Sequence, residues 1–146
     1  MKTGIIILCH NQEKTLDTLQ CVQHIHHSKN IEFCFVNNNS NDNTYELLKE
    51  ISEVCQNVSV VNINKYKKDI SAIRAGARFM FDQFTIQYLG FVTADMIGKY
   101  ENLSQLLAKI LNNQLHIVSS RQSFLKQRKM KLTLFQSLFP ISDYLE

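Results

Sequence analysis

Short apolar runs alternate along this chain of 146 residues with longer segments in which apolar residues recur every three or four positions. The short runs cover residues 4–9, 31–36, 58–63, 88–92 and 115–120. Continuous apolar runs of this length are typical of strands buried on both faces of a sheet. Strands that alternate with helices form parallel units with right-handed crossovers. The sequence therefore predicts an α/β, Rossmann-like, mainly parallel sheet with helices on both faces.

The segments between the runs predict amphipathic helices. The first carries Leu19 and Ile25 on its apolar face and ends in histidines 24, 26 and 27, which we interpret as a solvated helix end rather than a metal site. The second begins with a predicted capping box, in which Asn43 caps the helix and Glu46 reaches back to it. Two further helices are expected over residues 71–84 and 103–111.

The composition, 45% hydrophobic and 20% charged, is ordinary for one soluble globular domain. A net charge of +3 is too small to indicate nucleic-acid binding, and we expect no nucleic-acid partner. No apolar run reaches the roughly 20 residues of a membrane span, and the N-terminus becomes polar too early for a signal peptide. We therefore predict a cytoplasmic protein whose four cysteines are buried free thiols.

Polar residues follow each of the first four predicted strands. The longest such stretch, "NNNSNDNT" at residues 37–44, lies where a strand leads into a helix. Ligands of open α/β sheets bind outside the carboxyl ends of the strands, so we expect a binding site there. Neither a GxGxxG motif nor a GxxxxGK[ST] loop occurs in the sequence. Their absence argues against a nicotinamide-binding Rossmann domain and against a P-loop enzyme.

Five segments in this order resemble the GT-A nucleotide-sugar transferases of glycosyltransferase family 2, in particular those that make polyprenyl-phosphate sugars. They are "LCHNQE" from Leu8, "VNNNSNDNT" from Val36, "KKDISAIRAG" from Lys67, Thr93-Ala94-Asp95 at the position of a DxD motif, and "HIVSSR", which ends at Arg121. The resemblance covers residues 4 to about 121. It implies a GT-A fold and transfer of a sugar from a nucleotide diphosphate, for cell-envelope or lipid-linked glycan synthesis.

The resemblance assigns nucleotide-sugar binding to residues of the strand ends. His10 would lie against the base as an aromatic platform, although a purely structural role in the loop is an open alternative. Asn37 occupies the position of an aspartate that accepts the N3–H of uracil in the family. A neutral amide makes a weaker bond than a carboxylate, so preference for uridine should weaken. The other implied positions are Leu8, Asn38, Lys68, Arg74 and Ala94.

Asp95 is the candidate metal ligand. Mg²⁺ or Mn²⁺ on a nucleoside diphosphate needs only one or two protein carboxylates, because phosphate oxygens and water complete its coordination. Thr93 replaces the first acid of the DxD pattern, which weakens the expected site, and a role of Asp95 as a helix cap is the alternative. Lys68 and Arg74 would balance the charge of the diphosphate. Asp42 and Asn43 are expected to serve as turn and cap residues.

The chain is expected to divide into a nucleotide-sugar-binding domain over residues 1–121 and a basic amphipathic segment over residues 122–146. That segment predicts a poorly anchored helix. It is compatible with packing on its own sheet, on a second copy of the chain in a homo-oligomer, or on an anionic membrane surface. The sugar or lipid-phosphate acceptor site would lie there, with Asp143 of "PISDY" as a remote candidate for the catalytic base, which is otherwise unassigned. A catalytically degenerate module that only binds a nucleotide or a partner is the alternative function.

Overall fold

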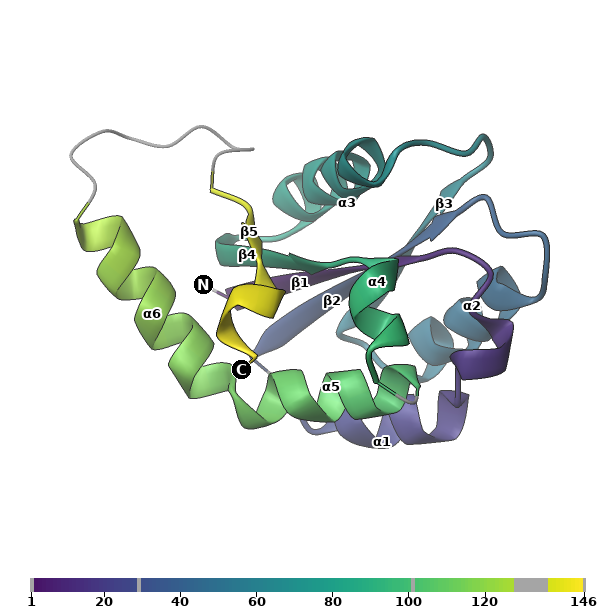
Figure 1. Cartoon of the computed structure of the whole chain (residues 1–146), viewed down its shortest axis with the longest axis horizontal. Coiled ribbons are helices and arrows are strands. Elements are labelled where there is room, and N and C mark those ends of the chain that lie inside the picture. Colours follow the sequence, from purple (N-terminus) through teal and green to yellow (C-terminus); the bar gives the residue numbers. More distant parts are fainter. Residues whose placement is uncertain (1, 29, 101, 128–136, 146) are drawn as a thin grey trace.

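The computed structural model describes residues 2–28, 30–100, 102–127 and 137–145, with only the backbone of Ala94 and Asp95. Strands and helices alternate along the chain as far as β4 (Figure 1). The strands are β1 (Lys2–Cys9), β2 (Ile31–Asn38), β3 (Val58–Ile63), β4 (Ile86–Val92) and β5 (Phe139–Pro140). The helices are α1 (Thr18–His26), α2 (Thr44–Val54), α3 (Asp69–Gln83), α4 (Ala94–Gly98), α5 (Leu103–Asn112) and α6 (Gln114–Lys126), with short 3-10 helices η1 (Glu13–Thr15) and η2 (Ile141–Tyr144).

The five strands form one all-parallel sheet in the order β3-β2-β1-β4-β5. This arrangement confirms the predicted α/β class. The chain builds outward from β1 to β3, and α3 then carries it back across the sheet to β4 on the other side of β1 (Figure 1). The strand order therefore reverses at β1 and β4, which is where open α/β sheets bind ligands outside their carboxyl ends.

Both faces of the sheet are covered, so its central strands are apolar on both sides. Ile5 and Ile7 of β1 belong to the core with α1, α2, α5 and α6, whereas Ile6 and Leu8 point into a second core under α3. Successive side chains of a strand point to opposite faces, which explains this division. Gly76 brings α3 close to the sheet, because a Cβ there would lie 2.7 Å from a methyl group of Val36.

Residues 115–120 form part of helix α6, so the prediction of a strand there was wrong. A strand would place Leu115 and Ile117 on the same face, but Leu115 is 86% exposed and Ile117 is buried. Ile117 and Arg121, four residues apart, both point inward, as one face of a helix requires. The guanidinium of Arg121 lies 4.4 Å from the Phe124 ring centre and 4.5 Å from that of Phe139. The "HIVSSR" segment therefore resembles the family in sequence but is helical in this structure.

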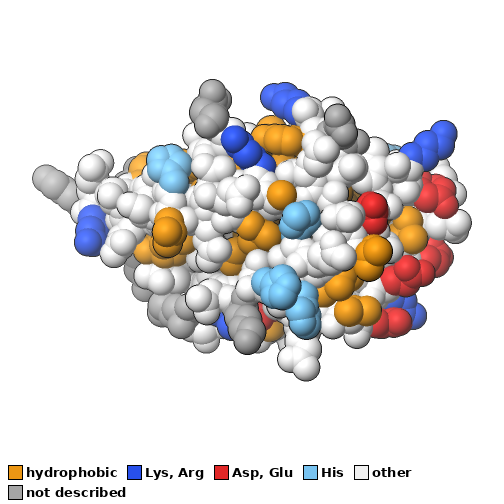
Figure 2. Space-filling model, turned by 90° about the horizontal axis from the view of Figure 1, so that it is seen from below, with side chains coloured by type: hydrophobic (Ala, Val, Ile, Leu, Met, Phe, Trp, Pro, Cys, Tyr) orange, Lys and Arg blue, Asp and Glu red, His pale blue; other side chains and the backbone are white. Residues whose placement is uncertain are grey.

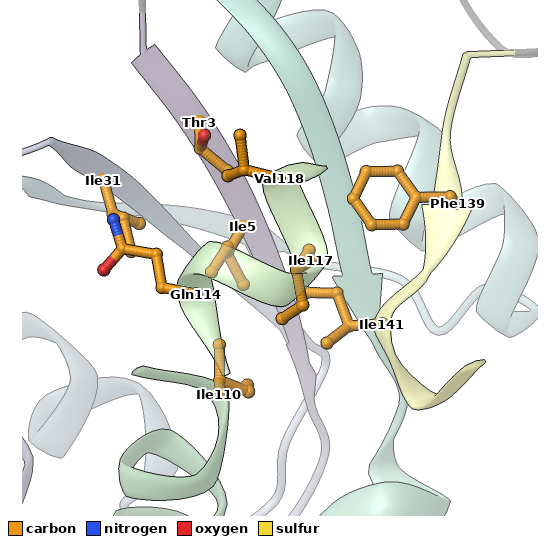
Figure 3. A pocket seen from close by; sticks show the side chains of 9 residues that line it. All are labelled: Thr3, Ile5, Ile31, Ile110, Gln114, Ile117, Val118, Phe139 and Ile141. Carbon is orange, nitrogen blue, oxygen red and sulfur yellow. The ribbon is translucent and has the colours of Figure 1, made fainter. Parts of the chain in front are cut away.

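The fifth strand comes instead from the C-terminal residues, where β5 pairs with Gly90 and Phe91 of β4. Phe139, Ile141 and Leu145 are buried, so residues 137–145 are well anchored, contrary to the expectation of a loosely held tail. Residues 128–136 of the predicted basic amphipathic segment lie outside the described residues. Figure 3 shows the apolar pocket beneath α6, lined by Thr3, Ile5, Ile31, Ile110, Gln114, Ile117, Val118, Phe139 and Ile141. Its cavity of about 10 Å³ is too small for more than a single water, so this pocket is a packing defect rather than a nucleotide site.

The underside of the molecule is formed by helices that include α1 and α5. Figure 2 shows histidine side chains exposed on this face, with acidic side chains gathered toward one end. His26 and His27 are exposed and His24 is half-buried, in line with a solvated helix end. Leu19, expected on the apolar face of α1, is 64% exposed, and the helix instead buries Cys21 and Ile25. None of the helices within the described ranges is long and apolar enough to span a bilayer.

Candidate functional site

The candidate site is built from loops at the carboxyl edge of four neighbouring strands. Parallel pairing places Cys9 of β1 opposite Asn37 of β2, and Asn37 opposite Asn62 of β3. On the other side of β1, β4 ends at Val92 and leads directly into α4, whose first turn contains Asp95. The backbone of Asp95 and the end of β2 at Asn37 therefore lie on the same edge of the sheet, as the family resemblance predicts.

The asparagine-rich loop after β2 is bonded to the loop after β1. The backbone N–H of Asn11 donates to Ser40 Oγ at 2.9 Å, and the backbone N–H of Asn41 donates to Asn11 Oδ1 at 2.7 Å. Asn11 and Asn39 have φ values of 53° and 51°, a left-handed conformation that asparagine tolerates better than most residues. Much of the asparagine content therefore serves to shape and join these two loops.

Asp42 caps and joins the same loops through its carboxylate. Oδ2 accepts from the backbone N–H of Glu13 at 3.2 Å, while Oδ1 accepts from the backbone N–H and the hydroxyl of Thr44. Partial burial tends to raise the pKa of Asp42, but these hydrogen bonds outweigh it and lower the pKa. Asn43 occupies the N-cap position of α2, as predicted. Its side chain makes no capping hydrogen bond, so the predicted capping box, which needs that bond, was wrong.

Asn38 fixes the loop between β3 and α3. Its carboxamide donates from Nδ2 to the carbonyl oxygen of Lys67 at 2.8 Å and accepts at Oδ1 from the backbone N–H of Lys67 at 3.0 Å. The side chain is only 1% exposed, so both bonds are shielded from water. Asn38 therefore holds the basic loop at residues 65–68 against the end of β2, a positioning role that the sequence pattern does not reveal.

Asn37 belongs to a chain of amide hydrogen bonds across the strand ends. Its Oδ1 accepts from the hydroxyl of Ser40 at 2.6 Å, and its Nδ2 donates to Oδ1 of Asn62 at 2.8 Å. Asn62 in turn donates to Oδ1 of Asn64 at 3.4 Å. Asn37 is 3% exposed, so this network and not solvent satisfies its carboxamide. Both ends of the group that the resemblance assigns to the base are already bonded.

His10 stands at the end of β1 with its ring half-buried. Nδ1 lies 2.7 Å from the carbonyl oxygen of Asn38, which can only accept, so Nδ1 carries a proton. In the neutral ring Nε2 then accepts from Nδ2 of Asn11, 3.2 Å away. The ring meets that of Tyr66 edge to face, with 5.0 Å between centroids and an interplanar angle of 66°. Tyr66 was not predicted from the sequence, where only its place between lysines could have drawn notice.

The other predicted binding residues fall into two groups. Lys68 is the N-cap residue of α3 and is exposed, and Arg74, six residues further along the same helix, is also exposed. Leu8 is 1% exposed and packs in the core under α3, so its side chain supports the strand and does not reach the edge. Ala94 lies in the first turn of α4, where only the backbone is described.

Among the described residues, the carboxyl edge offers few protein ligands for a divalent metal. Thr93 is the N-cap residue of α4, and the side chain of Asp95 lies outside the described atoms. Within the described ranges no three residues among His, Cys, Asp and Glu are grouped to hold an ion. The backbone position of Asp95 nevertheless fits a site in which a diphosphate and water supply the remaining oxygen ligands.

A hollow of about 490 Å³ lies beside α4, between it and the C-terminal residues. Lys99 and Tyr100 line it from the end of α4, and Ser142 and Asp143 line it from η2. Asp143 is exposed. Because β5 pairs with β4 in parallel, η2 follows the carboxyl end of β5 and lies on the same edge of the sheet as α4. The remote candidate base therefore shares this hollow with the end of α4.

Together, the strand order and this polar edge define the class of open, doubly wound α/β domains that bind a ligand outside the carboxyl ends of their strands. Residues 4–140 match the family model of Glycosyl transferase family 2. The chain therefore belongs to glycosyl transferase family 2, which supports a glycosyltransferase-type function. A comparison with curated proteins gives no match.

Proposed function

We propose that the protein transfers a sugar from a nucleotide-diphosphate sugar to an acceptor hydroxyl or lipid phosphate, for cell-envelope or lipid-linked glycan synthesis. The observation that carries this proposal is the position of His10, Asn37 and the first turn of α4 on one edge of adjacent parallel strands in a family 2 chain. A nucleotide whose base lies at the carboxyl ends of β2 and β1 would direct its diphosphate toward α4. Cytoplasmic location, contact with an anionic membrane and self-association stay predictions.

Charged residues around this edge have distinct proposed roles. Lys68 and Arg74 would offset the negative charge of the diphosphate and of the leaving group. Asp95 would bind Mg²⁺ or Mn²⁺ together with phosphate oxygens, and the ion would supply further charge stabilisation when bound. These roles require only that the side chains of α3 and α4 reach the space outside β1 and β4.

Asp143 is the proposed general base for a hydroxyl acceptor. In the transfer step the acceptor oxygen bonds to the anomeric carbon while the bond from that carbon to the diphosphate oxygen breaks. The acceptor proton passes to the carboxylate, and the nucleoside diphosphate leaves with the bonding electron pair. Support comes from the exposure of Asp143 and from the hollow that it shares with Lys99 and Tyr100 beside α4.

A binding module without catalysis is the second candidate. It is favoured by the engaged carboxamide of Asn37 and by Thr93 at the position of the first acid of the DxD motif. Both features weaken contacts on which the family reaction depends. Such a module would still bind nucleotides at the same edge, so binding alone does not separate the two functions.

Calorimetry against nucleoside diphosphates, with and without Mn²⁺, tests the site. The proposal expects metal to strengthen binding and Asp95→Ala to remove that gain without changing the melting temperature. Metal-independent binding together with a lowered melting temperature of Asp95→Ala would identify a helix cap instead. Asn37→Asp combined with Thr93→Asp should strengthen binding of uridine diphosphate.

Turnover is tested by release of nucleoside diphosphate from a panel of nucleotide sugars with soluble glycan and lipid-phosphate acceptors. Asp143→Asn should abolish release while leaving donor affinity unchanged. Asp82→Asn, an exposed substitution near the C-terminal end of α3, is the matched control. Donor binding with no release on any acceptor would favour the binding module.

A further inference from the structure

Tyr66 is the one exposed aromatic ring that contacts His10 within the described part of the chain. It is 55% exposed and lies in the loop between β3 and α3, flanked by Lys65 and Lys67. No hydrogen bond to its hydroxyl is present among the described residues, so the ring is not held there by a polar contact. Exposure of a large aromatic side chain beside a candidate binding site suggests that it contacts a ligand.

The loop that carries Tyr66 is fixed to the strand ends. Asn38 bonds both the N–H and the carbonyl group of Lys67, the next residue, and its own carbonyl oxygen accepts from His10. One buried asparagine thus connects the backbone beside Tyr66 to the ring of His10. The two rings stand at 66° to each other, one at the end of β1 and the other in the loop after β3.

We propose that the nucleobase of the donor stacks on the ring of Tyr66, which the ring of His10 supports edge to face, and that the base is recognised mainly by its flat face. This inference rests on the proposed nucleotide-sugar function. Nothing in the sequence resemblance assigns Tyr66 a role. Lys65 and Lys67 on either side would attract the phosphates of the same ligand without contacting the base.

Recognition by the face of the base follows from the state of Asn37. Its Oδ1 accepts from Ser40 and its Nδ2 donates to Asn62, so its capacity to read the base edge is reduced. Stacking is tolerant of base identity, because every base has a π-face. The site should therefore discriminate weakly among uridine, cytidine, guanosine and adenosine diphosphates.

The test measures the affinities of these four nucleoside diphosphates by calorimetry for the wild type, Tyr66→Ala and Tyr66→Phe. Loss of a stacking platform weakens binding by roughly 5- to 150-fold in single-strand nucleic-acid sites, so we expect about tenfold for Tyr66→Ala with each base. Tyr66→Phe should bind as the wild type does, because the ring and not the hydroxyl carries the interaction. Lys65→Ala is the neighbouring control, and it should weaken binding less than Tyr66→Ala at high salt, where charge is screened.

Tyrosine fluorescence gives a second readout, because the chain contains five tyrosines and no tryptophan. Nucleotide should quench the emission of the wild type and of Tyr45→Phe, but much less that of Tyr66→Phe, although Tyr66→Phe still binds. Two results would overturn this inference alone, provided that the wild type binds. In the first, Tyr66→Ala changes the affinity by less than twofold. In the second, Tyr66→Phe weakens binding as much as Tyr66→Ala does. A wild type that binds none of the four diphosphates would overturn the proposed function as well.

Discussion

Replacement of Asn38 should loosen the candidate site and destabilise the fold together. Asn38→Ala removes two buried hydrogen bonds, to the N–H and the carbonyl group of Lys67. A typical buried hydrogen bond contributes about 0.5–1.5 kcal/mol, so the expected loss is about 1–3 kcal/mol of unfolding free energy. Because residues 65–68 are then no longer held against β2, binding of nucleoside diphosphate should weaken as well.

Urea denaturation followed by circular dichroism measures this effect. With a slope of about 2 kcal/mol per molar urea, a loss of 2 kcal/mol lowers the midpoint by about 1 M. The matched control is Asn41→Ala, because the Asn41 side chain is exposed and makes no hydrogen bond within the described residues. Its midpoint should stay close to that of the wild type. Equal midpoints for Asn38→Ala and Asn41→Ala would refute the role assigned to Asn38.

Asn38→Asp gives a sharper test of the same two bonds. An ionised carboxylate can still accept from the N–H of Lys67 but repels its carbonyl oxygen, whereas the protonated acid can donate to that oxygen. Burial and the carbonyl group should both raise the pKa of the introduced acid in the folded state. Such a shift destabilises the fold at high pH, and the deficit relative to the wild type should shrink as pH falls through the raised pKa. A deficit that is independent of pH between about 4 and 8 would contradict this geometry.

Three further predictions concern other parts of the molecule. Burial raises the pKa of Cys21 to about 12 and raises the pKa of the other three cysteines above the ordinary value. Iodoacetamide at pH 8 should therefore modify none of the four in the native protein and all four in urea, and mass spectrometry measures this modification. The lowered pKa of Asp42 means that its carboxylate stabilises the fold above its unfolded pKa of about 4 and that this contribution is lost as pH falls through the folded value. The urea midpoints of the wild type and Asp42→Asn should therefore differ at pH 7 and converge in acid, and a constant difference would count against the hydrogen bonds assigned to it. Gly90→Ala should cost about 1–3 kcal/mol in the same urea assay, because its Cβ would lie 2.6 Å from Ile141, whereas Gly98→Ala, with open space around it, should cost nothing.

The pattern of the sequence was sufficient to predict the first four strands and the helices between them. Those strands are buried on two faces, so each is a continuous apolar run, and the helices that cover them show a period near 3.6. Position at a strand end was also sufficient to bring His10, Asn37 and Asp95 to one edge, because parallel strands all end at the same side of a sheet. The family resemblance then indicated which polar loops to examine.

Residues 115–120 show where local pattern failed. A short apolar run fits a strand or a buried helix equally well, and here packing of Ile117 and of the Arg121 guanidinium against Phe139 decided for a helix. The edge position beside β4 was taken by residues 139–140, near the end of the chain. Pairing between segments so distant in sequence leaves little local signal.

The roles within the asparagine loop were likewise decided only by tertiary structure. The sequence determined that the strand ends are polar and nearly uncharged, but all the asparagines look alike in it. In the folded chain, Asn38 hydrogen-bonds to the backbone of Lys67, and Asn37 hydrogen-bonds to the side chains of Ser40 and Asn62. The ring of Tyr66 contacts that of His10. An amide can bond to whatever donor or acceptor the fold places within about 3 Å, so its partner is a property of the folded chain and not of the residue.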